Sequence, residues 1–243
     1  NVAIYNPSNP TGYNLASANA LGGGANLRTI DDNYTNIAFV LDKNRYQSDQ
    51  YRILNNSFLE FTLAKGLKLR SQLGIDYYTD NSSQILDPRH GDGAGSVGLI
   101  YQGQQNILNT NIQNYLNYNF SIKKHNIYLT AGHEIQQTTS RFYAAQGISL
   151  SDIFYLKENI ITNTAGTPSI SGNYTKSAIE SFFGRFNYDY KGKYFLQGSI
   201  RRDGQSSLAQ GKRYGTFPGA SIGWRPVQES FWKNVPFLNK SIN

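Results

Sequence analysis

The segment that most constrains the fold is FFGRFNYDYKGKYFLQGSIRRDG, Phe182 to Gly204, in which apolar and polar residues alternate on both sides of a glycine turn. Before the turn, the apolar or small positions are Phe182, Gly184, Phe186, Tyr188 and Tyr190, and the intervening ones are Phe183, Arg185, Asn187 and Asp189. Successive residues of a β-strand point to opposite faces, so the pattern predicts a strand with one apolar and one largely polar face. The KGK triplet predicts a tight turn, and Tyr194, Leu196, Gly198 and Ile200 continue the apolar face.

Further hairpins of the same kind lie upstream. FLEFTLAKG turns at Ala64 to Gly66 into LKLRSQLGIDYYT, and NIQNYLNYNFSIKKHNIYLTAGHEI turns at KKHN. Between the hairpins, glycine- and asparagine-bearing connections at roughly Asp80 to Val97, Phe142 to Lys176 and Gly204 to Lys212 are expected to be loops. Tight turns therefore alternate with long loops. This is the arrangement of outer-membrane barrels, which have short periplasmic turns and long extracellular loops.

Composition leaves two classes of all-β protein open. The chain is 39% hydrophobic and 14% aromatic, its mean hydropathy is -0.51, and it has no apolar run of transmembrane-helix length. A transmembrane β-strand needs only about 9–11 residues with alternate apolar positions, so low mean hydropathy does not argue against a membrane. A soluble antiparallel sandwich also alternates. The alternating segments are longer than the strands of most soluble sheets, and aromatic residues gather near their ends, which favours the barrel.

The charges indicate neither nucleic-acid binding nor nucleotide binding. The net charge is +7, but Lys and Arg are scattered without a basic run, so no nucleic-acid partner is expected. The chain has no cysteine, which excludes disulfides, thiol catalysis and cysteine-ligated metal within it. Gly211-Lys212-Arg213 leads into an expected strand rather than a helix, so DGQSSLAQGKRYG is not a phosphate-binding loop.

The histidines and acidic residues give no convergent metal or catalytic group. His133 and Glu134 are neighbours on an expected strand and face apart, while His125 lies in a turn. In DPRHGDG, Asp87 and Asp92 are weighed as calcium ligands against a polar surface turn, and we favour the turn. No Ser-His-Asp group can be assembled. We therefore expect no metal, no cofactor and no catalytic residues.

A family resemblance rests on SFFGRFNYDYKGKYFLQGSIRRDGQSSLAQGKRYGTFPGASIGWRPVQESFWK, Ser181 to Lys233. This stretch resembles the signature region of SusC-like TonB-dependent transporters of Bacteroidetes, with its FGR-N-Y-Y-KY run, its RRDGSS-F motif and its G-FPS-S-GW motif. Leu208 stands where the family favours Phe, and Gly219 where it favours Ser. The ranges Tyr51 to Tyr78 and Asn117 to Glu134 agree more weakly with other strand pairs of the family.

The resemblance implies a fold, a location and partners. The fold would be all-β, an antiparallel transmembrane β-barrel segment with roughly eight strands of a larger, 22-stranded barrel. Residues 1–243 would be a partial barrel domain of a TonB-dependent receptor in the bacterial outer membrane, with no plug, no TonB box and no C-terminal closing strand. The whole protein would be a non-enzymatic importer of oligosaccharides or peptides. It would work with a SusD-like surface lipoprotein, with TonB acting on the plug, and in contact with outer-membrane lipid.

The candidate substrate-binding residues lie on the expected lumenal face and in the expected loops. Arg201 and Asp203 share a face that Arg202 does not, which predicts an ion-pair ladder along a wet lumen. The full set is Arg185, Asp189, Arg201, Asp203 and Arg213, with the loop aromatics Tyr101, Phe154, Tyr155 and Tyr174. On the last strand, Tyr214, Ala220, Ile222 and Trp224 are expected to face lipid, and Arg213, Ser221 and Arg225 the lumen.

Other interpretations stay open at this point. They are an outer-membrane barrel enzyme, which would need an acid–histidine or serine–histidine group at the rim, and a soluble glycan-binding β-sandwich or adhesin. The last stretch, Gln228 to Lys233, is expected to be a short amphipathic periplasmic turn, with Phe231 and Trp232 near the inner interface.

Overall fold

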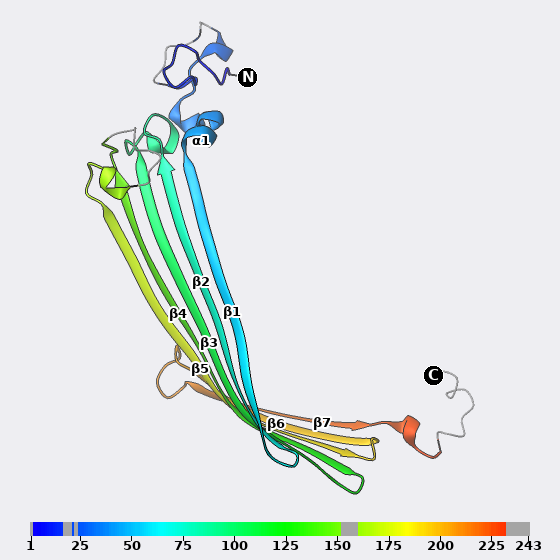
Figure 1. Cartoon of the computed structure of the whole chain (residues 1–243). Helices are drawn as coiled ribbons and strands as arrows, with labels where there is room; N and C mark the ends of the chain where they lie inside the picture. Colours follow the sequence, from blue (N-terminus) through cyan, green and yellow to red (C-terminus); the bar gives the residue numbers. More distant parts are fainter. Residues whose placement is uncertain (1, 17–20, 22–23, 152–159, 232–243) are drawn as a thin grey trace. The chain divides into compact units, whose positions relative to one another are not determined.

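The chain forms one long antiparallel β-sheet. The computed structural model describes residues 2–16, 21, 24–151 and 160–231 (Figure 1). In this part of the chain, 7 strands lie in chain order, each hydrogen-bonded to the next, against the roughly eight expected. They are β1 (Arg45–Ala64), β2 (Leu67–Leu86), β3 (Leu99–Ile122), β4 (His125–Ile148), β5 (Ser169–Tyr190), β6 (Tyr194–Gln205) and β7 (Tyr214–Trp224). The short helix α1 (Ile37–Lys43) precedes β1. Among the described residues, no helix has both the length and the apolar character that crossing a bilayer requires.

The strands β1 to β5 are longer than the sequence predicts. β3 and β4 each have 24 residues, whereas about 9–11 suffice to cross a bilayer. The predicted bounds of two loops were therefore too wide. The range Asp80 to Val97 is strand as far as Leu86, and the range Phe142 to Lys176 is strand up to Ile148 and again from Ser169. The extensions of β2 and β5 are polar at most positions, and that of β4, FYAAQGI, has apolar or small residues on both faces, so all three lack the alternation by which a strand is detected in sequence.

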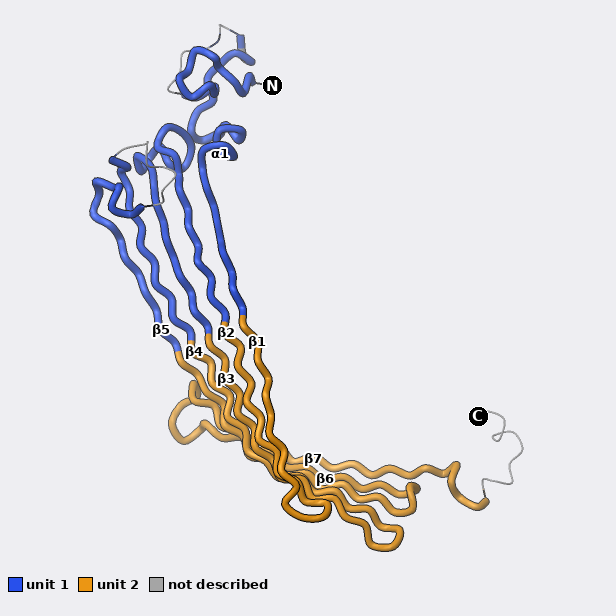
Figure 2. The backbone as a smooth tube through the Cα atoms, in the orientation of Figure 1, with its two compact units in different colours: residues 1–52, 78–107, 140–175 blue, residues 53–77, 108–139, 176–243 orange. Residues whose placement is uncertain are grey.

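The sheet divides into two compact units, shown in different colours in Figure 2. Unit 1 comprises Asn1–Arg52, Tyr78–Ile107 and Ser140–Thr175, and unit 2 comprises Ile53–Tyr77, Leu108–Thr139 and Lys176–Asn243. The connections Asp87 to Gly98 and Ser149 to Pro168 belong to unit 1. The tight turns between β1 and β2, β3 and β4, and β5 and β6 belong to unit 2, and so does the third expected loop, between β6 and β7. Two of the three expected loops are therefore in a different unit from the tight turns.

In unit 2 the strand register matches the sequence prediction. Tyr190 pairs with Tyr194 across the Lys191–Lys193 turn, and Gly184 pairs with Ile200, which places all the predicted apolar positions of this hairpin on one face. Between β6 and β7, Leu196 pairs with Ile222 and Gln197 with Ser221. We call the face that contains Leu196 and Ile222 the apolar face, and the opposite one the polar face. Every β6 and β7 residue predicted to face lipid lies on the apolar face.

The apolar face is exposed rather than buried in a core. Leu59 is 65% exposed and Ile222 is 87% exposed, although burying such side chains would stabilise a soluble fold by about 1.5–3 kcal/mol each. In the described part of the chain, no second sheet covers them. A soluble sandwich would bury these side chains against a facing sheet, so this exposure contradicts the sandwich interpretation.

Unit 1 holds the small buried core of the chain at the loop ends of its strands. Leu15, Phe39, Ile85 and Ile100 are fully or almost fully buried there. Asn36 begins α1 by accepting hydrogen bonds from the backbone N–H groups of Ala38 and Phe39, a common N-cap arrangement. The core therefore fixes the loops and α1 to one another, while the sheet itself has no apolar interior.

Candidate functional site

An ion-pair network crosses the polar face of unit 2. The Arg201 Nη2 atom lies 3.1 Å from Glu134 Oε2 on β4 and donates to Ser181 Oγ on β5 at 2.9 Å. Its Nε donates to Asp203 Oδ1 at 2.7 Å. Gln113 on β3 donates to the other oxygen of Glu134 at 2.8 Å. The predicted ladder of Arg201 and Asp203 thus exists, and it extends over neighbouring strands to partners that the sequence analysis did not assign to it.

Arg185 and Arg201 line one hollow on the polar face. Its volume is ≈ 360 Å³, and Thr130, Phe183 and Ser199 contribute to its walls. The Arg201 guanidinium lies 5.7 Å from the centre of the Phe183 ring. In the part of the chain that the structure describes, Arg201 has carboxylate partners and Arg185 has none, and Arg185 is exposed. Arg185 is therefore the cation here that remains available to an anionic or strongly polar ligand.

Two other predicted residues stabilise connections instead. Asp189 accepts a hydrogen bond from the Gly192 N–H at 2.7 Å and so closes the turn between β5 and β6. Six residues separate it along β5 from the position opposite Arg201, roughly 20 Å of strand. Arg213 donates from Nε to the Leu208 carbonyl at 3.1 Å within the connection between β6 and β7. Neither residue lines the Arg185 hollow.

The predicted loop aromatics Tyr101 and Tyr174 lie in strands. Tyr101 is on β3, where its phenol covers Gly103, and it lines a hollow of ≈ 320 Å³ with Tyr46, Ser48, Ser82 and Gln84. Tyr174 is on β5, where Arg141 lies 5.6 Å from its ring centre. β4 lies between these two strands, so the tyrosines do not form one cluster. Phe154 and Tyr155 lie outside the described residues, as do Trp232 and Lys233.

Strand alternation assigns the Tyr101 hollow to the polar side. Tyr101 and Gly103 occupy the same set of alternate positions on β3 as Asn109 and Gln113. The Ser82 hydroxyl on β2 bonds to the Gly103 carbonyl, and Ser82 shares its set with Arg70. Tyr174 belongs to the other set, which in unit 2 contains Phe182. Of the two predicted loop aromatics that the structure describes, only Tyr101 occupies the polar set of alternate positions, to which Arg201 and Glu134 belong on their own strands.

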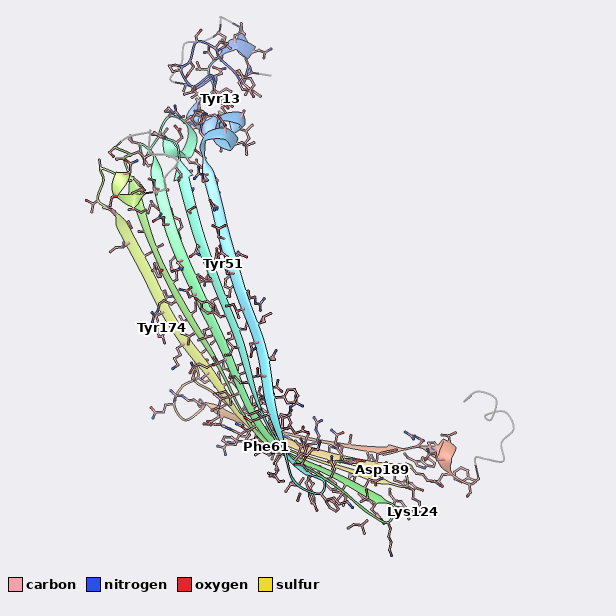
Figure 3. The ribbon with its side chains drawn as sticks, in the orientation of Figure 1. Tyr13, Tyr51, Phe61, Lys124, Tyr174 and Asp189 are labelled. Atoms are coloured by element: carbon pink, nitrogen blue, oxygen red, sulfur yellow. The ribbon has the colours of Figure 1, made fainter. Side chains whose placement is uncertain are left out.

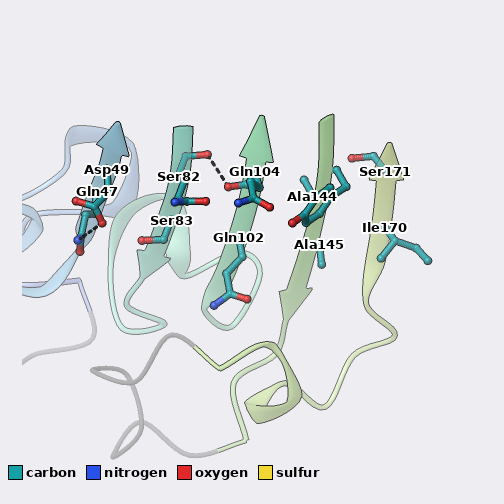
Figure 4. Close-up of a pocket in the computed structure, with 13 residues that line it drawn as sticks. Gln47, Asp49, Ser82, Ser83, Gln102, Gln104, Ala144, Ala145, Ile170 and Ser171 are labelled. Atoms are coloured by element: carbon teal, nitrogen blue, oxygen red, sulfur yellow. Dashed lines mark hydrogen bonds between the residues drawn. The ribbon is translucent and has the colours of Figure 1, made fainter. Parts of the chain in front are cut away.

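A larger hollow in unit 1 was not predicted (Figure 4). It has a volume of ≈ 760 Å³, and side chains of Gln47, Asp49, Asn81, Ser83, Gln102 and Gln104 line much of it. Gln47 donates to Asp49 at 2.8 Å. These residues alternate along their strands with Ser48, Ser82 and Gly103, which belong to the polar set of positions. They therefore occupy the other set of alternate positions, which carries the apolar residues in unit 2. The runs DNSSQ and QGQQ are the sequence feature that indicates this hollow, because a strand with amides at successive positions meets water on both faces.

The DPRHGDG segment is held by protein contacts. The buried Asp87 carboxylate is bonded to the Arg89 side chain and to the Arg89 backbone N–H. The buried His90 accepts from the Asn36 backbone N–H at Nε2, 2.8 Å away, and its Nδ1 lies 2.8 Å from Asp32 Oδ1. Among the described residues, no group of three or more His, Cys, Asp and Glu side chains could hold a metal ion. These contacts assign Asp87 and His90 to the loop core.

Glu229 anchors the segment after β7, which includes the 3-10 turn Pro226–Gln228. Its carboxylate accepts from Lys193 Nζ at 2.8 Å and from the Tyr194 hydroxyl at 2.7 Å, and Trp224 Nε1 lies 3.5 Å away. The hydrogen bond from Lys193, reinforced by that from Tyr194, lowers the pKa of Glu229 to about 2. The segment is therefore tied to the β5–β6 turn, on the side expected to be periplasmic.

Comparisons with known proteins give relatives of one kind. No protein-family model matches the chain. The chain is 29% identical over 195 residues to TonB-dependent receptor P39 of Formosa agariphila, covering 75% of this chain and 18% of that receptor. It is 26% identical over 181 residues to TonB-dependent receptor SusC of Bacteroides thetaiotaomicron, covering 74% of this chain and 17% of SusC. The chain thus spans about a fifth of the length of these relatives.

A solved structure supports the same assignment of fold. The structure of the RagAB peptide transporter matches 92% of this chain and 24% of that chain, with a TM-score of 0.71 at 20% identity. At this identity the match concerns the fold alone. In sequence and in fold, the chain resembles a section of the barrel of SusC-type TonB-dependent receptors, which confirms the resemblance found in its motifs. The sheet is that of an outer-membrane β-barrel.

Proposed function

We propose that this chain forms a section of the barrel wall of an outer-membrane TonB-dependent transporter of the SusC type, and that residues 1–243 are a partial barrel domain. The separation of faces in unit 2 carries the proposal. Exposed side chains such as Leu59, Leu196, Ile222 and Trp224 occupy one face, and the Arg201–Glu134 network occupies the other. Near the bilayer midplane a lipid-facing surface tolerates only the first kind, since an arginine or lysine there costs about 2–4 kcal/mol, whereas the cost near the interfaces is small.

The polar face would line the path of the substrate. In this proposal the whole protein imports oligosaccharides or peptides, and the Tyr101 and Arg185 hollows contact them on the way. Tyrosine rings stack on sugars and on planar peptide groups, and neighbouring hydroxyls and amides exchange hydrogen bonds with either. Asp189 and Arg213 are proposed to act on turn and loop structure only. A SusD-like lipoprotein on the extracellular side and TonB on the periplasmic side are the proposed partners.

We propose no enzymatic activity for the section. An acid–histidine pair does exist, because His133 Nε2 lies 2.9 Å from Glu180 Oε1. His133 stacks on Phe182, and the Tyr214 hydroxyl is bonded to Glu180. Phe182 and Tyr214 lie on the apolar face, so the His133–Glu180 pair would face lipid and could not act on a substrate in the lumen. The described neighbours include no serine or cysteine nucleophile in contact with it.

Cysteine labelling tests the proposed orientation of the faces. The chain has no cysteine, so single cysteines can be introduced without background from it. In the full-length protein in outer-membrane vesicles, Ser199→Cys and Ser221→Cys should react with a water-soluble maleimide once the lumen is hydrated. Their neighbours Ala220→Cys and Ile222→Cys should be protected by lipid and become reactive only in denaturant. Equal labelling of both sets in the vesicles would overturn the proposal.

A further inference from the structure

Every tight turn of unit 2 carries lysine. The turns are Lys65-Gly66 between β1 and β2, Lys123-Lys124 between β3 and β4, and Lys191–Lys193 between β5 and β6. They lie close together, because the Lys191 N–H donates to the Lys124 carbonyl at 2.9 Å and the Asn119 N–H donates to the Gly66 carbonyl at 2.8 Å. Figure 3 labels Lys124 at the tip of its turn. The lysines therefore form one basic rim, which we call the turn rim: Lys65, Lys123, Lys124, Lys191 and Lys193.

Turn geometry does not explain the choice of lysine. Lys123 has φ 56° and Lys191 has φ 58°, in the left-handed region that favours glycine and asparagine. A lysine at such a position is strained relative to either of these residues. The lysines are thus present despite the backbone, which points to a use for their side-chain charge.

The carboxylates at this end of unit 2 are already engaged. Glu60 bonds to Lys68 at 2.7 Å, Glu229 bonds to Lys193 at 2.8 Å, and Asp189 accepts from the Gly192 N–H. In the part of the chain that the structure describes, the exposed residues Lys65, Lys123, Lys124 and Lys191 have no carboxylate partner. Four of the five lysines of the turn rim therefore carry positive charge that no described carboxylate compensates, and only Lys193 is paired.

An aromatic row borders the turn rim on the apolar face. Tyr190, Tyr194 and Trp224 pair across β5, β6 and β7, and Lys191 Nζ lies 5.0 Å from the Tyr190 ring centre. Tyr and Trp gather at the depth where the hydrocarbon of a bilayer meets its headgroups. Cations placed one turn beyond such a row lie at the depth of the lipid phosphates.

We propose that the turn rim binds the phosphate headgroups of anionic phospholipids in the periplasmic leaflet of the outer membrane. This inference rests on the proposed function, because it requires the sheet to be a barrel wall in a bilayer. Each lysine supplies a mobile ammonium group with several N–H donors to a phosphate oxygen, and the aromatic row keeps the rim at headgroup depth. The occupant is a lipid rather than an acidic periplasmic protein, because the rim is continuous with the membrane-facing surface.

Spin-labelled lipids test the proposal in the full-length protein. After reconstitution in phosphatidylcholine, electron paramagnetic resonance gives the selectivity of the protein surface for spin-labelled phosphatidylglycerol over spin-labelled phosphatidylcholine. The wild type should prefer phosphatidylglycerol, and the preference should fall with added salt, since charges are screened within about 8 Å at physiological ionic strength. Lys123→Asn with Lys191→Asn suits the backbone of both turns and should reduce the selectivity by roughly fivefold.

Matched variants separate the turn rim from net charge. Lys123→Arg with Lys191→Arg should retain the selectivity, and Lys176→Gln with Lys212→Gln, which removes the same charge away from the tight turns, should leave it unchanged. Unchanged selectivity in the asparagine variant, or equal loss in the Lys176 and Lys212 variant, overturns the inference. If the maleimide pattern shows a correctly inserted barrel while selectivity is absent, this inference fails alone. If the pattern itself fails, the proposed function fails.

Discussion

Arg201 on β6 and Glu134 on β4 form an ion pair of 3.1 Å across the intervening strand β5, whose Ser181 hydroxyl accepts a hydrogen bond from the same guanidinium. Arg201 therefore connects three successive strands on one face. The half-exposed network is one that a water-filled lumen can hold, because water solvates what the partners leave unsatisfied.

Arg201→Ala should destabilise the full-length protein by about 1–2 kcal/mol in denaturant unfolding. The variant loses hydrogen bonds to Glu134, Ser181 and Asp203, but water partly replaces them. Arg185→Ala is the matched control, since Arg185 lines the same hollow without a described carboxylate partner, and it should stay within about 0.5 kcal/mol of the wild type. Equal losses in the two variants would contradict the assigned network.

Tyr101→Ala should weaken substrate binding by roughly tenfold, because a stacking aromatic contributes about 0.5–1.5 kcal/mol beyond its buried area. The measurement is binding of the transported ligand to the purified full-length protein by calorimetry. Tyr174→Ala removes a tyrosine from the other set of alternate positions and should leave the affinity unchanged. A loss with Tyr174→Ala but none with Tyr101→Ala would reverse our assignment of the two faces.

Acid should release the segment after β7. The pKa of Glu229 is lowered from 4.5 to about 2, so the folded state binds this proton less readily than the unfolded state. The stabilisation is therefore complete above the usual pKa and is lost as the pH falls through about 2. The fluorine resonance of 5-fluorotryptophan at Trp224, assigned with Trp224→Phe, should titrate in that window. In Glu229→Gln the titration should be absent, and its persistence would mean that another group is responsible.

Gly66→Ala should impair barrel assembly more than Gly211→Ala does. Both glycines have positive φ, 77° and 86°, which costs an alanine about 1–2 kcal/mol. At Gly66 the added methyl group would also overlap the Asn119 carbonyl, whereas at Gly211 it meets open space. The folded fraction of the full-length protein, read from heat-modifiable mobility on gels, should fall further for Gly66→Ala. Equal fractions would show that the overlap is relieved by movement of β3.

The sequence predicts unit 2 well because one environment lies on each side of its sheet. A residue of the apolar face such as Ile222 and one of the polar face such as Ser221 differ in kind, so alternation fixes strand, face and register together. In unit 1 the ends of β2 and β5 are polar on both faces, and the end of β4 is apolar or small on both, so alternation disappears there and these ends were taken for loops. The strands there are held by hydrogen bonds to their neighbours, and the residue pattern of one strand alone does not reveal these bonds.

The candidate site was predicted only in part, for a similar reason. Arg201 and Asp203 are two residues apart on one strand, so their pairing follows from alternation. Glu134 lies 67 positions away from Arg201, and only the order and register of β4, β5 and β6 bring the two together. Asp189 lies three residues before Gly192 and closes the turn as a hydrogen-bond acceptor, a contact that alternation along the strand does not predict.

Strand β5 is 22 residues long and β6 is 12, and their pairing begins only at Ile179 and Gln205. From Ser169 to Ala178, the edge of β5 that faces away from β4 therefore has backbone N–H and C=O groups that do not pair with β6. The exception is Ala178, which is hydrogen-bonded to Ser206. The wall has a step at this point. A strand from a neighbouring polypeptide could extend the sheet here by backbone pairing alone, without demanding a particular side chain of its partner.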